Sequence, residues 1–147
     1  MTFLPKNKVV IPVDFSPQSL AAAEVALDLV QNPSHLHIIH VLPIITDYEV
    51  GLAWANIGDD ARRRHAEQAL KERLPEPKFA SATKVVLFGD AGTEIARYAE
   101  EQHADAIVIP SHGYTGLKRL LIGSVAERVV RLAHCPVLVL KHVKPTL

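Results

Sequence analysis

Two glycines and a serine near the C-terminus have the residue types and the spacing that phosphate binding requires. Gly113 is followed by nine residues and then by the pair Gly123-Ser124. At a glycine turn and at a helix start, unpaired backbone amides point outward, the helix dipole is positive, and glycine lets ligand oxygens come close. The spacing therefore predicts a phosphate site built from a turn and a helix N-terminus.

The residues around these glycines predict the elements that position them. Residues 107–110 form a short apolar run typical of a buried strand, and residues 111–113 turn out of it. Residues 125–133 alternate apolar and charged side chains at helical spacing. Ser124 and Glu127 also fit a capping box, in which the serine bonds forward to an amide and the glutamate bonds back. Capping and phosphate binding are compatible roles for Ser124, because a helix start has several free amides.

The rest of the chain alternates apolar strands with helices. Strands are expected at 8–14, 36–41, 83–88, 106–110 and 136–141, and helices after Ser16, from Asp59 and through about Gln102. This alternation predicts a single-domain α/β fold over residues 1–147, a doubly wound five-stranded parallel sheet with helices on both faces. Such sheets bind ligands outside the carboxyl ends of the strands, where the strand order reverses.

The composition argues against several classes of function. Sixteen Lys and Arg balance sixteen Asp and Glu, so neither nucleic acid nor a membrane surface is expected as a partner. No apolar stretch reaches the ~20 residues of a membrane span and no signal peptide is recognised, so a cytoplasmic location is expected. The single cysteine, Cys135, is interpreted as a buried small apolar residue, and the eight histidines lack the spacing of a metal site.

Three features have two interpretations each. Asp14, at the end of the first predicted strand, either caps the next helix, as Ser16 does equally well, or faces a ligand. Residues 42–58 form a long apolar connection with Tyr48 and Trp54, which either covers a ligand or packs on the core. The arginines at 62–64 are typical of a solvated helix face rather than of a binding patch.

The order and spacing of these motifs resemble those of the universal stress protein family over essentially the whole chain. The similar segments are residues 9–16, His40-Val41, Gly89-Asp90, and the stretches 104–109, 111–127 and 134–139. The resemblance implies the strand order 3-2-1-4-5. In that order the strand Val137–Leu140 lies at an apolar sheet edge, and we expect a second copy to cover it antiparallel in a two-fold homodimer.

The nucleotide-binding branch of that family is similar to a pattern of glycine, two residues, glycine, nine residues, then glycine and Ser or Thr. Gly113, Gly123 and Ser124 match the later positions, whereas Pro110 replaces the first glycine. Proline has no amide hydrogen and a fixed φ, but it keeps its carbonyl and suits a strand end. The candidate cofactor-binding residues are Pro12, Val13, Asp14, Val41, Ile109, Pro110, His112, Gly113, Gly123, Ser124 and Val125.

The resemblance also implies a role for each part of this set. Asp14 and the Val41 backbone hold the adenine end of ATP, ADP or AMP, and the turn around Ile109 lies near the ribose. The phosphates, with Mg²⁺, are held by Gly113, Gly123, Ser124 and Val125. His112, inside the phosphate turn, is expected to orient the ligand by a hydrogen bond rather than to act as an acid or base.

A nucleotide-dependent sensor or regulator of the stress response is therefore the expected function. An enzyme is not expected, because the chain has no GxxxxGK[ST] loop, no evident second acidic residue for Mg²⁺ and no placed general base; slow ATP hydrolysis is the most we expect. The alternative is a dimeric interaction module that works without nucleotide, marked by Pro110.

Overall fold

The structure, a computed structural model of the chain, describes residues 4–46, 58–113 and 121–141. Within these residues, five parallel strands form one sheet in the order β3-β2-β1-β4-β5. The strands are β1 (Val9–Pro12), β2 (Leu36–Leu42), β3 (Thr83–Phe88), β4 (Ala106–Pro110) and β5 (Val137–Leu140). The predicted α/β class and strand order are confirmed.

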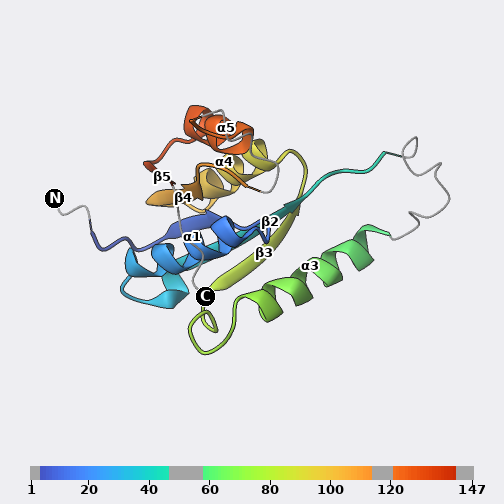
Figure 1. Cartoon of the computed structure of the whole chain (residues 1–147), viewed down its shortest axis with the longest axis horizontal. Helices are drawn as coiled ribbons and strands as arrows, with labels where there is room; N and C mark the ends of the chain where they lie inside the picture. Colours follow the sequence, from blue (N-terminus) through green and yellow to red (C-terminus); the bar gives the residue numbers. More distant parts are fainter. Residues whose placement is uncertain (1–3, 47–57, 114–120, 142–147) are drawn as a thin grey trace.

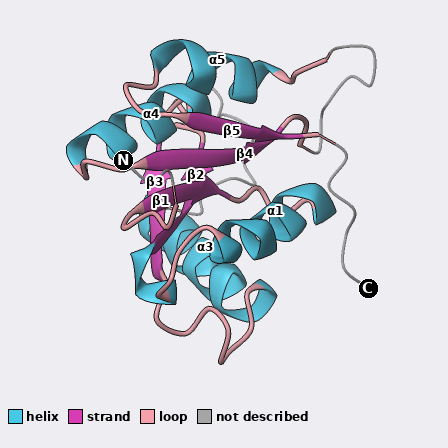
Figure 2. Cartoon of the chain, turned by 90° about the vertical axis from the view of Figure 1, so that its left-hand side faces the viewer, coloured by secondary structure: helices cyan, strands magenta, loops and turns pink. Residues whose placement is uncertain are grey.

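Helices cover both faces of this sheet (Figures 1 and 2). On one face lie α1 (Pro17–Asp28) and α3 (Asp59–Arg73), and on the other lie α4 (Ala91–Glu101) and α5 (Ser124–Leu132). A short 3-10 helix, η1 (Pro33–His35), precedes β2. The sheet is thus doubly wound, as the alternation of strands and helices predicts.

Each central strand sends side chains into two separate cores. Val9 of β1 belongs to the cluster that includes Ala22 of α1 and Leu70 of α3. Its neighbour Val10 belongs to the cluster that includes Ile95 of α4 and Val129 of α5. Because both faces are buried, β1 and β4 are apolar throughout rather than alternating with polar residues.

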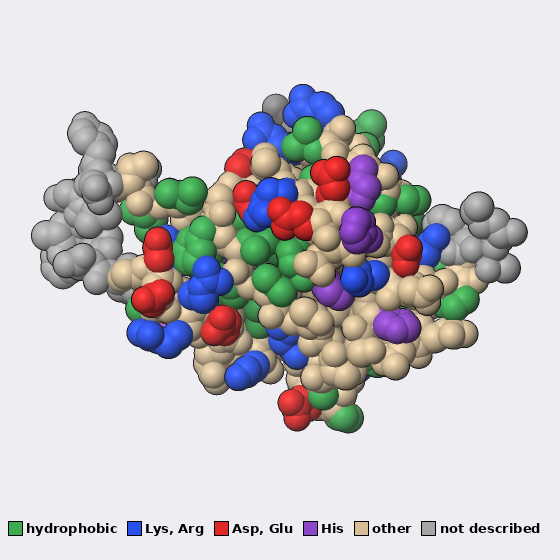
Figure 3. Space-filling model, turned by 180° about the vertical axis from the view of Figure 1, so that it is seen from behind, with side chains coloured by type: hydrophobic (Ala, Val, Ile, Leu, Met, Phe, Trp, Pro, Cys, Tyr) green, Lys and Arg blue, Asp and Glu red, His purple; other side chains and the backbone are tan. Residues whose placement is uncertain are grey.

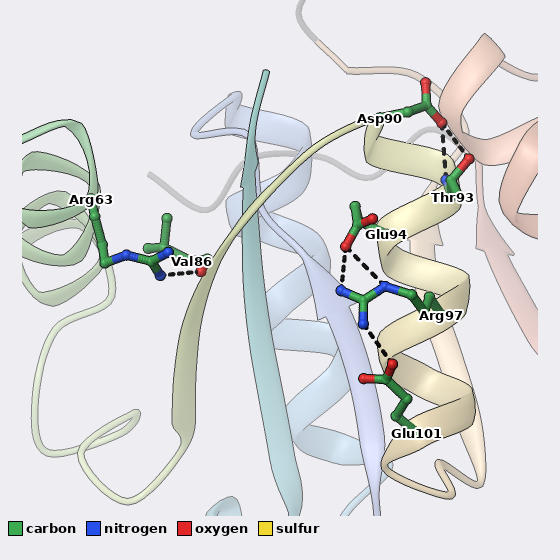
Figure 4. Close-up of polar contacts among 7 residues, drawn as sticks. All are labelled: Arg63, Val86, Asp90, Thr93, Glu94, Arg97 and Glu101. Carbon is green, nitrogen blue, oxygen red and sulfur yellow. Dashed lines mark hydrogen bonds and ion pairs between the residues drawn. The ribbon is translucent and has the colours of Figure 1, made fainter. Parts of the chain in front are cut away.

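Local signals in the sequence set the helix starts. Ser16 is the N-cap of α1 and Pro17 its first residue, while the Asp90 side chain caps α4 by accepting from the Thr93 amide at 3.0 Å (Figure 4). The strand expected at 8–14 ends earlier, at Pro12, because Phe15 adopts a φ of 65° and the chain turns into α1.

Two of the three arginines at 62–64 are half-buried, so their interpretation as a solvated face was wrong. Arg63 Nη1 donates to the Val86 carbonyl at 2.7 Å, as Figure 4 shows. The guanidinium carbons of Arg62 and Arg63 lie 5.4 and 4.9 Å from the centre of the Phe88 ring. Arg62 also pairs with Asp59 at 3.0 Å. These contacts place α3 over the outer edge of β3.

Cys135, predicted to be buried, is half-buried instead. Burial raises the pKa of its thiol more than a backbone hydrogen bond lowers it, and the Asp105 carboxylate adds a smaller upward effect. A thiol with a raised pKa stays protonated at neutral pH and is a poor nucleophile, so the interpretation as a small apolar residue rather than a reactive one fits.

The outer surface mixes charges of both signs. On the side opposite to the view of Figure 1, described basic and acidic side chains are interspersed, with histidines among them (Figure 3). In the part of the chain that the structure describes, no helix has both the length and the apolar character needed to cross a bilayer. Tyr48 and Trp54, whose role the sequence left open, lie outside the described residues.

Candidate functional site

A cavity of about 220 Å³ opens at the carboxyl ends of β1, β2 and β4. The first residues of α4 and α5 complete its wall. The strand order reverses between β1 and β4. From β1 the chain continues to β2 and β3 on one side of the sheet, and then crosses to β4 and β5 on the other side. The cavity therefore lies at the switch point where doubly wound sheets bind their ligands.

Ten of the eleven candidate residues line this one cavity, although they come from separate elements. They are Pro12, Val13, Asp14, Val41, Ile109, Pro110, Gly113, Gly123, Ser124 and Val125. The lining residues that the sequence analysis did not single out are Ser19, Ile39, His40, Ala91, Ile95, Ser111 and Ala126. Four of these seven are apolar residues whose helical or strand periodicity indicates only burial, so no local signal marked them as cavity wall.

Pro110 lies where β4 no longer pairs with β1, so its missing amide hydrogen costs no hydrogen bond to β1. The register between β1 and β4 ends at the pair Val10–Ile107, before Pro110 is reached. On its other side Pro110 is in register with Leu140, and the Ser111 amide donates to the Leu140 carbonyl at 2.9 Å. The sheet thus accommodates proline here because β1 and β4 have already diverged to form the cavity.

The turn after β1 is fixed by side-chain hydrogen bonds. The Ser16 side chain caps α1, accepting from the Ser19 amide at 3.1 Å, so Ser16 and not Asp14 is the N-cap. Asp14 Oδ1 accepts from the Ser16 amide at 2.9 Å, and the Asp14 amide donates to Ser19 Oγ at 3.2 Å. His40 Nδ1 is hydrogen-bonded to the Val13 carbonyl at 2.7 Å. The Asp14 carboxylate is thereby held at the cavity wall.

The start of α5 is built differently, from backbone alone. Gly123 is its N-cap, and no side chain caps the helix, so the capping box proposed for Ser124 and Glu127 does not form. The first helical bond runs from the Glu127 amide to the Gly123 carbonyl at 2.9 Å. The amides of the first turn have no partner within the helix, and they lie at the cavity that Ser124 and Val125 line.

Both motif glycines lie where a side chain would not fit without movement. A Cβ on Gly113 would overlap the Asp14 Oδ2 atom, and a Cβ on Gly123 would lie 3.0 Å from the Ser111 carbonyl oxygen. That carbonyl accepts a 2.5 Å hydrogen bond from the Gly123 amide, which joins the turn after β4 to the start of α5. The glycine spacing seen in the sequence therefore reflects two close contacts, of Gly113 with the Asp14 side chain and of Gly123 with the Ser111 backbone.

His112 is the one candidate residue that does not line the cavity. Its Nδ1 atom lies at hydrogen-bonding distance, 3.2 Å, from Ser111 Oγ. Its Nε2 atom is buried and finds no hydrogen-bond partner among the described residues. The His112 ring is thus bonded within the turn after β4 and is not part of the cavity wall.

An ion pair connects the two helices whose first turns close the cavity. Arg128 Nη1 of α5 lies 3.0 Å from Asp90 Oδ2 at the start of α4. Hydrogen bonds from Thr93, and then from Arg128, hold the pKa of the Asp90 carboxyl below its ordinary value. Gly92 lets the helices approach closely, because a Cβ there would lie 2.7 Å from Arg128 Cβ. In the described parts of the chain, no three His, Cys, Asp or Glu side chains are grouped to hold a metal ion.

Comparison with known proteins gives a consistent result over nearly the whole chain. A model of the universal stress protein family matches residues 6–141. The universal stress protein MJ0531 of Methanocaldococcus jannaschii is 38% identical over 145 residues, which cover 94% of this chain and 84% of that protein. The solved structure of MJ0577 from the same organism superposes with a TM-score of 0.77 at 25% identity, covering 95% of this chain and 98% of that one.

One further solved structure is a universal stress protein in complex with cAMP. It has a TM-score of 0.57 at 20% identity and covers 92% of this chain and 97% of its own. At that identity the similarity shows a shared fold.

Proposed function

This chain belongs to the universal stress protein family, and we propose that it binds an adenine nucleotide in the cavity at the carboxyl ends of β1, β2 and β4. One observation carries the proposal. Ten residues predicted from motif spacing and resemblance, spread from Pro12 to Val125, line a single cavity of about 220 Å³. Because these residues are far apart in the chain, proximity in the sequence does not explain why they line the same cavity.

The lining of the cavity contains groups that suit both ends of a nucleotide. Ile39, Ile95 and Ile109 contribute apolar surface against which a purine can be desolvated. In the proposed orientation, the Asp14 carboxylate and the Val41 backbone select the polar edge of the nucleoside. The amides at the start of α5 favour phosphate oxygens.

ATP, ADP and AMP are the ligands that we propose, with Mg²⁺ carried on the phosphates. Since no metal-binding group of three side chains is present among the described residues, the ion would be held by the ligand rather than by a protein cage. That the same fold occurs in a complex with cAMP supports an adenine nucleotide as the class of ligand.

We propose a regulatory rather than a catalytic role, with slow ATP hydrolysis at most. A bound nucleotide shifts a protein between two conformations by the difference in its affinity for them. The phosphate end of the proposed site is formed by glycines, a serine and backbone amides, which bind anions but do not transfer protons. We further propose that the protein acts in the cytoplasm, where a thiol such as Cys135 stays reduced.

Calorimetric titration of folded, nucleotide-stripped protein with Mg·ATP, ADP, AMP and adenosine tests the proposal. We expect saturable binding close to one site per chain. An absence of heat up to millimolar ATP would reject nucleotide binding and favour the interaction module that works without nucleotide. In that case Pro110→Gly shows whether the proline is responsible, because it restores an amide at the position of the first motif glycine.

A second proposal concerns β5, which lies at the end of the strand order. Leu138 on this strand is 41% exposed, and an uncovered apolar edge strand is prone to pairing with another chain. The opposite edge, β3, is covered by α3 through Arg63. We therefore propose an antiparallel homodimer through β5. Sedimentation velocity at micromolar concentration should show a dimer that Leu138→Lys dissociates, and a monomeric wild-type protein would contradict it.

A further inference from the structure

We propose that His40 and Phe15 are positioning residues that fix the turn after β1 and thereby hold Asp14 in place for the nucleoside end of the ligand. The inference rests on the proposed function, because it assigns residues that act through the site described above. Its starting point is that both neighbours of Asp14 in the chain, Val13 and Phe15, contact the same imidazole ring.

The first contact is a hydrogen bond from β2 to the residue that follows β1, whose amide also donates to the Ile39 carbonyl of β2 at 2.7 Å. His40 lies on β2, is half-buried and lines the cavity. Its Nδ1 atom is 2.7 Å from the carbonyl oxygen of Val13. Since a carbonyl only accepts, Nδ1 must carry the proton, and this fixes the tautomer of the neutral ring. The bond ties the residue before Asp14 to the neighbouring strand.

The second contact is between rings. The centre of the Phe15 ring lies 4.6 Å from that of His40, with an angle of 42° between the planes. Phe15 has a φ of 65°, a conformation that bulky side chains rarely adopt and that persists where the surroundings hold it. The imidazole is the aromatic partner of the Phe15 ring, so it supports the residue after Asp14 as well.

The position of the Asp14 carboxylate depends on the conformation of this turn. Its Oδ1 atom accepts from the Ser16 amide at 2.9 Å, while its Oδ2 atom lies against Gly113 in the turn after β4. A shift of the turn would move the carboxylate away from both. The start of α5, where the phosphates are proposed to bind, belongs to another element, so the two ends of the ligand can be tested separately.

Two substitutions distinguish positioning from simple packing. His40→Phe keeps a ring against Phe15 but removes the Nδ1 donor, whereas His40→Asn places a side-chain amide donor close to the position of Nδ1. His65→Phe, at an exposed histidine of α3, is the matched control. For each protein, calorimetry with adenosine and with Mg·ATP is combined with hydrogen exchange at the Ser16 amide in the absence of ligand.

For His40→Phe we expect about a tenfold loss of affinity, the same for adenosine and for ATP, because the lost bond leaves a partly buried carbonyl unpaired. The Ser16 amide should exchange faster in that variant. His40→Asn should stay within about threefold of wild type in affinity and restore the slow exchange, and His65→Phe should match wild type in both.

The possible failures are separable. Wild-type affinity in His40→Phe, or a loss confined to ATP, would overturn the positioning role while leaving nucleotide binding in place. So would a His40→Asn variant as weak as His40→Phe. If the wild-type protein binds neither ligand, the proposed function fails, and the positioning inference fails with it unless Ser16 exchange still separates His40→Phe from His40→Asn.

Discussion

The turn after β1 and the start of α5 face one cavity, but they are built by different means. Side chains add to the backbone in the first: besides the bond from the Val13 amide to the Ile39 carbonyl at 2.7 Å, His40 bonds to the Val13 carbonyl and Ser19 Oγ accepts from the Asp14 amide. The second is held by backbone, through the 2.5 Å bond from the Gly123 amide to the Ser111 carbonyl, and no side chain caps it.

Because its walls are built differently, one cavity can recognise two kinds of chemical group. A carboxylate held by a hydrogen bond from the Ser16 amide is directional, which suits the hydroxyl and amino groups of a nucleoside. Open amides at a helix start attract any anion of suitable size, which suits phosphates. Four experiments test this distinction, and the expected effect decreases from the first to the last.

Gly113→Ala acts where the two walls touch. The added Cβ would overlap Asp14 Oδ2, which can rotate away because it is the end of a side chain, but only by breaking its bond to the Ser16 amide. We expect a loss of ATP affinity of about thirtyfold, near 2 kcal/mol, since the carboxylate is displaced. The free energy of unfolding should fall by about 1 kcal/mol, because the bond to the Ser16 amide is lost.

Gly58→Ala is the control for the loss of affinity, because a Cβ there has nothing within 4 Å; since Gly58 is the N-cap of α3, the substitution itself lowers stability. Calorimetry and urea unfolding check both variants. Full ATP affinity in Gly113→Ala would show that the Asp14 carboxylate does not matter for binding.

Ser124→Ala tests the backbone-built wall. Ser124 is the first residue of α5 and does not cap it, so the substitution should leave stability nearly unchanged. We expect about a tenfold weaker affinity for ATP, from the loss of one hydroxyl contact to a charged phosphate, and an unchanged affinity for adenosine. Equal losses for both ligands, measured by calorimetry, would contradict the proposed orientation.

Ser16→Ala tests the side-chain-built wall, and its effect should fall on stability. The Ser16 hydroxyl is buried and caps α1, so its removal should lower the free energy of unfolding by about 1 kcal/mol. Urea unfolding measures the change, with the exposed neighbour Gln18→Ala as control. If Ser16→Ala and Ser124→Ala lowered the free energy of unfolding equally, the two helix starts would not differ in how they are capped.

Acidification should weaken α4, whose first turn completes the cavity. His37 Nδ1 is bonded to Tyr98 Oη of α4 at 2.8 Å, and burial, followed by the nearby Lys8 charge, lowers the pKa of His37 from 6.5. The folded state thus favours the neutral ring. Its contribution to stability is present above pH 6.5 and is lost as the pH falls below that value through the lowered pKa.

His37→Asn keeps a polar partner for Tyr98 and does not titrate. Urea unfolding at several pH values should therefore show a shallower loss of stability below pH 6.5 than in wild type. This is the smallest of the four effects, because the ring is only half-buried. An unchanged slope would mean that His37 does not couple protonation to folding.

Several features were fixed by local sequence alone. Apolar strand runs and helix starts such as Ser16-Pro17 predicted the alternation and the doubly wound sheet, because they depend on residues a few positions apart. The interval from Gly113 to Gly123 predicted a turn and a helix start that meet, since glycine is needed where backbones approach. Resemblance added Asp14 and Val41, which lie at strand ends where a parallel sheet converges.

Where the sequence allowed two roles for a residue, contacts between distant parts of the chain determine which role the residue has. Ser124 does not cap α5, and Arg63 bonds to the β3 edge, because each outcome depends on groups far away in the sequence. Pro110 is accommodated because β1 has already left β4, and His40 joins the site because β2 lies beside β1. Periodicity reports which residues are buried, but the pairing of distant groups depends on strand order and register, which bring them within hydrogen-bonding distance.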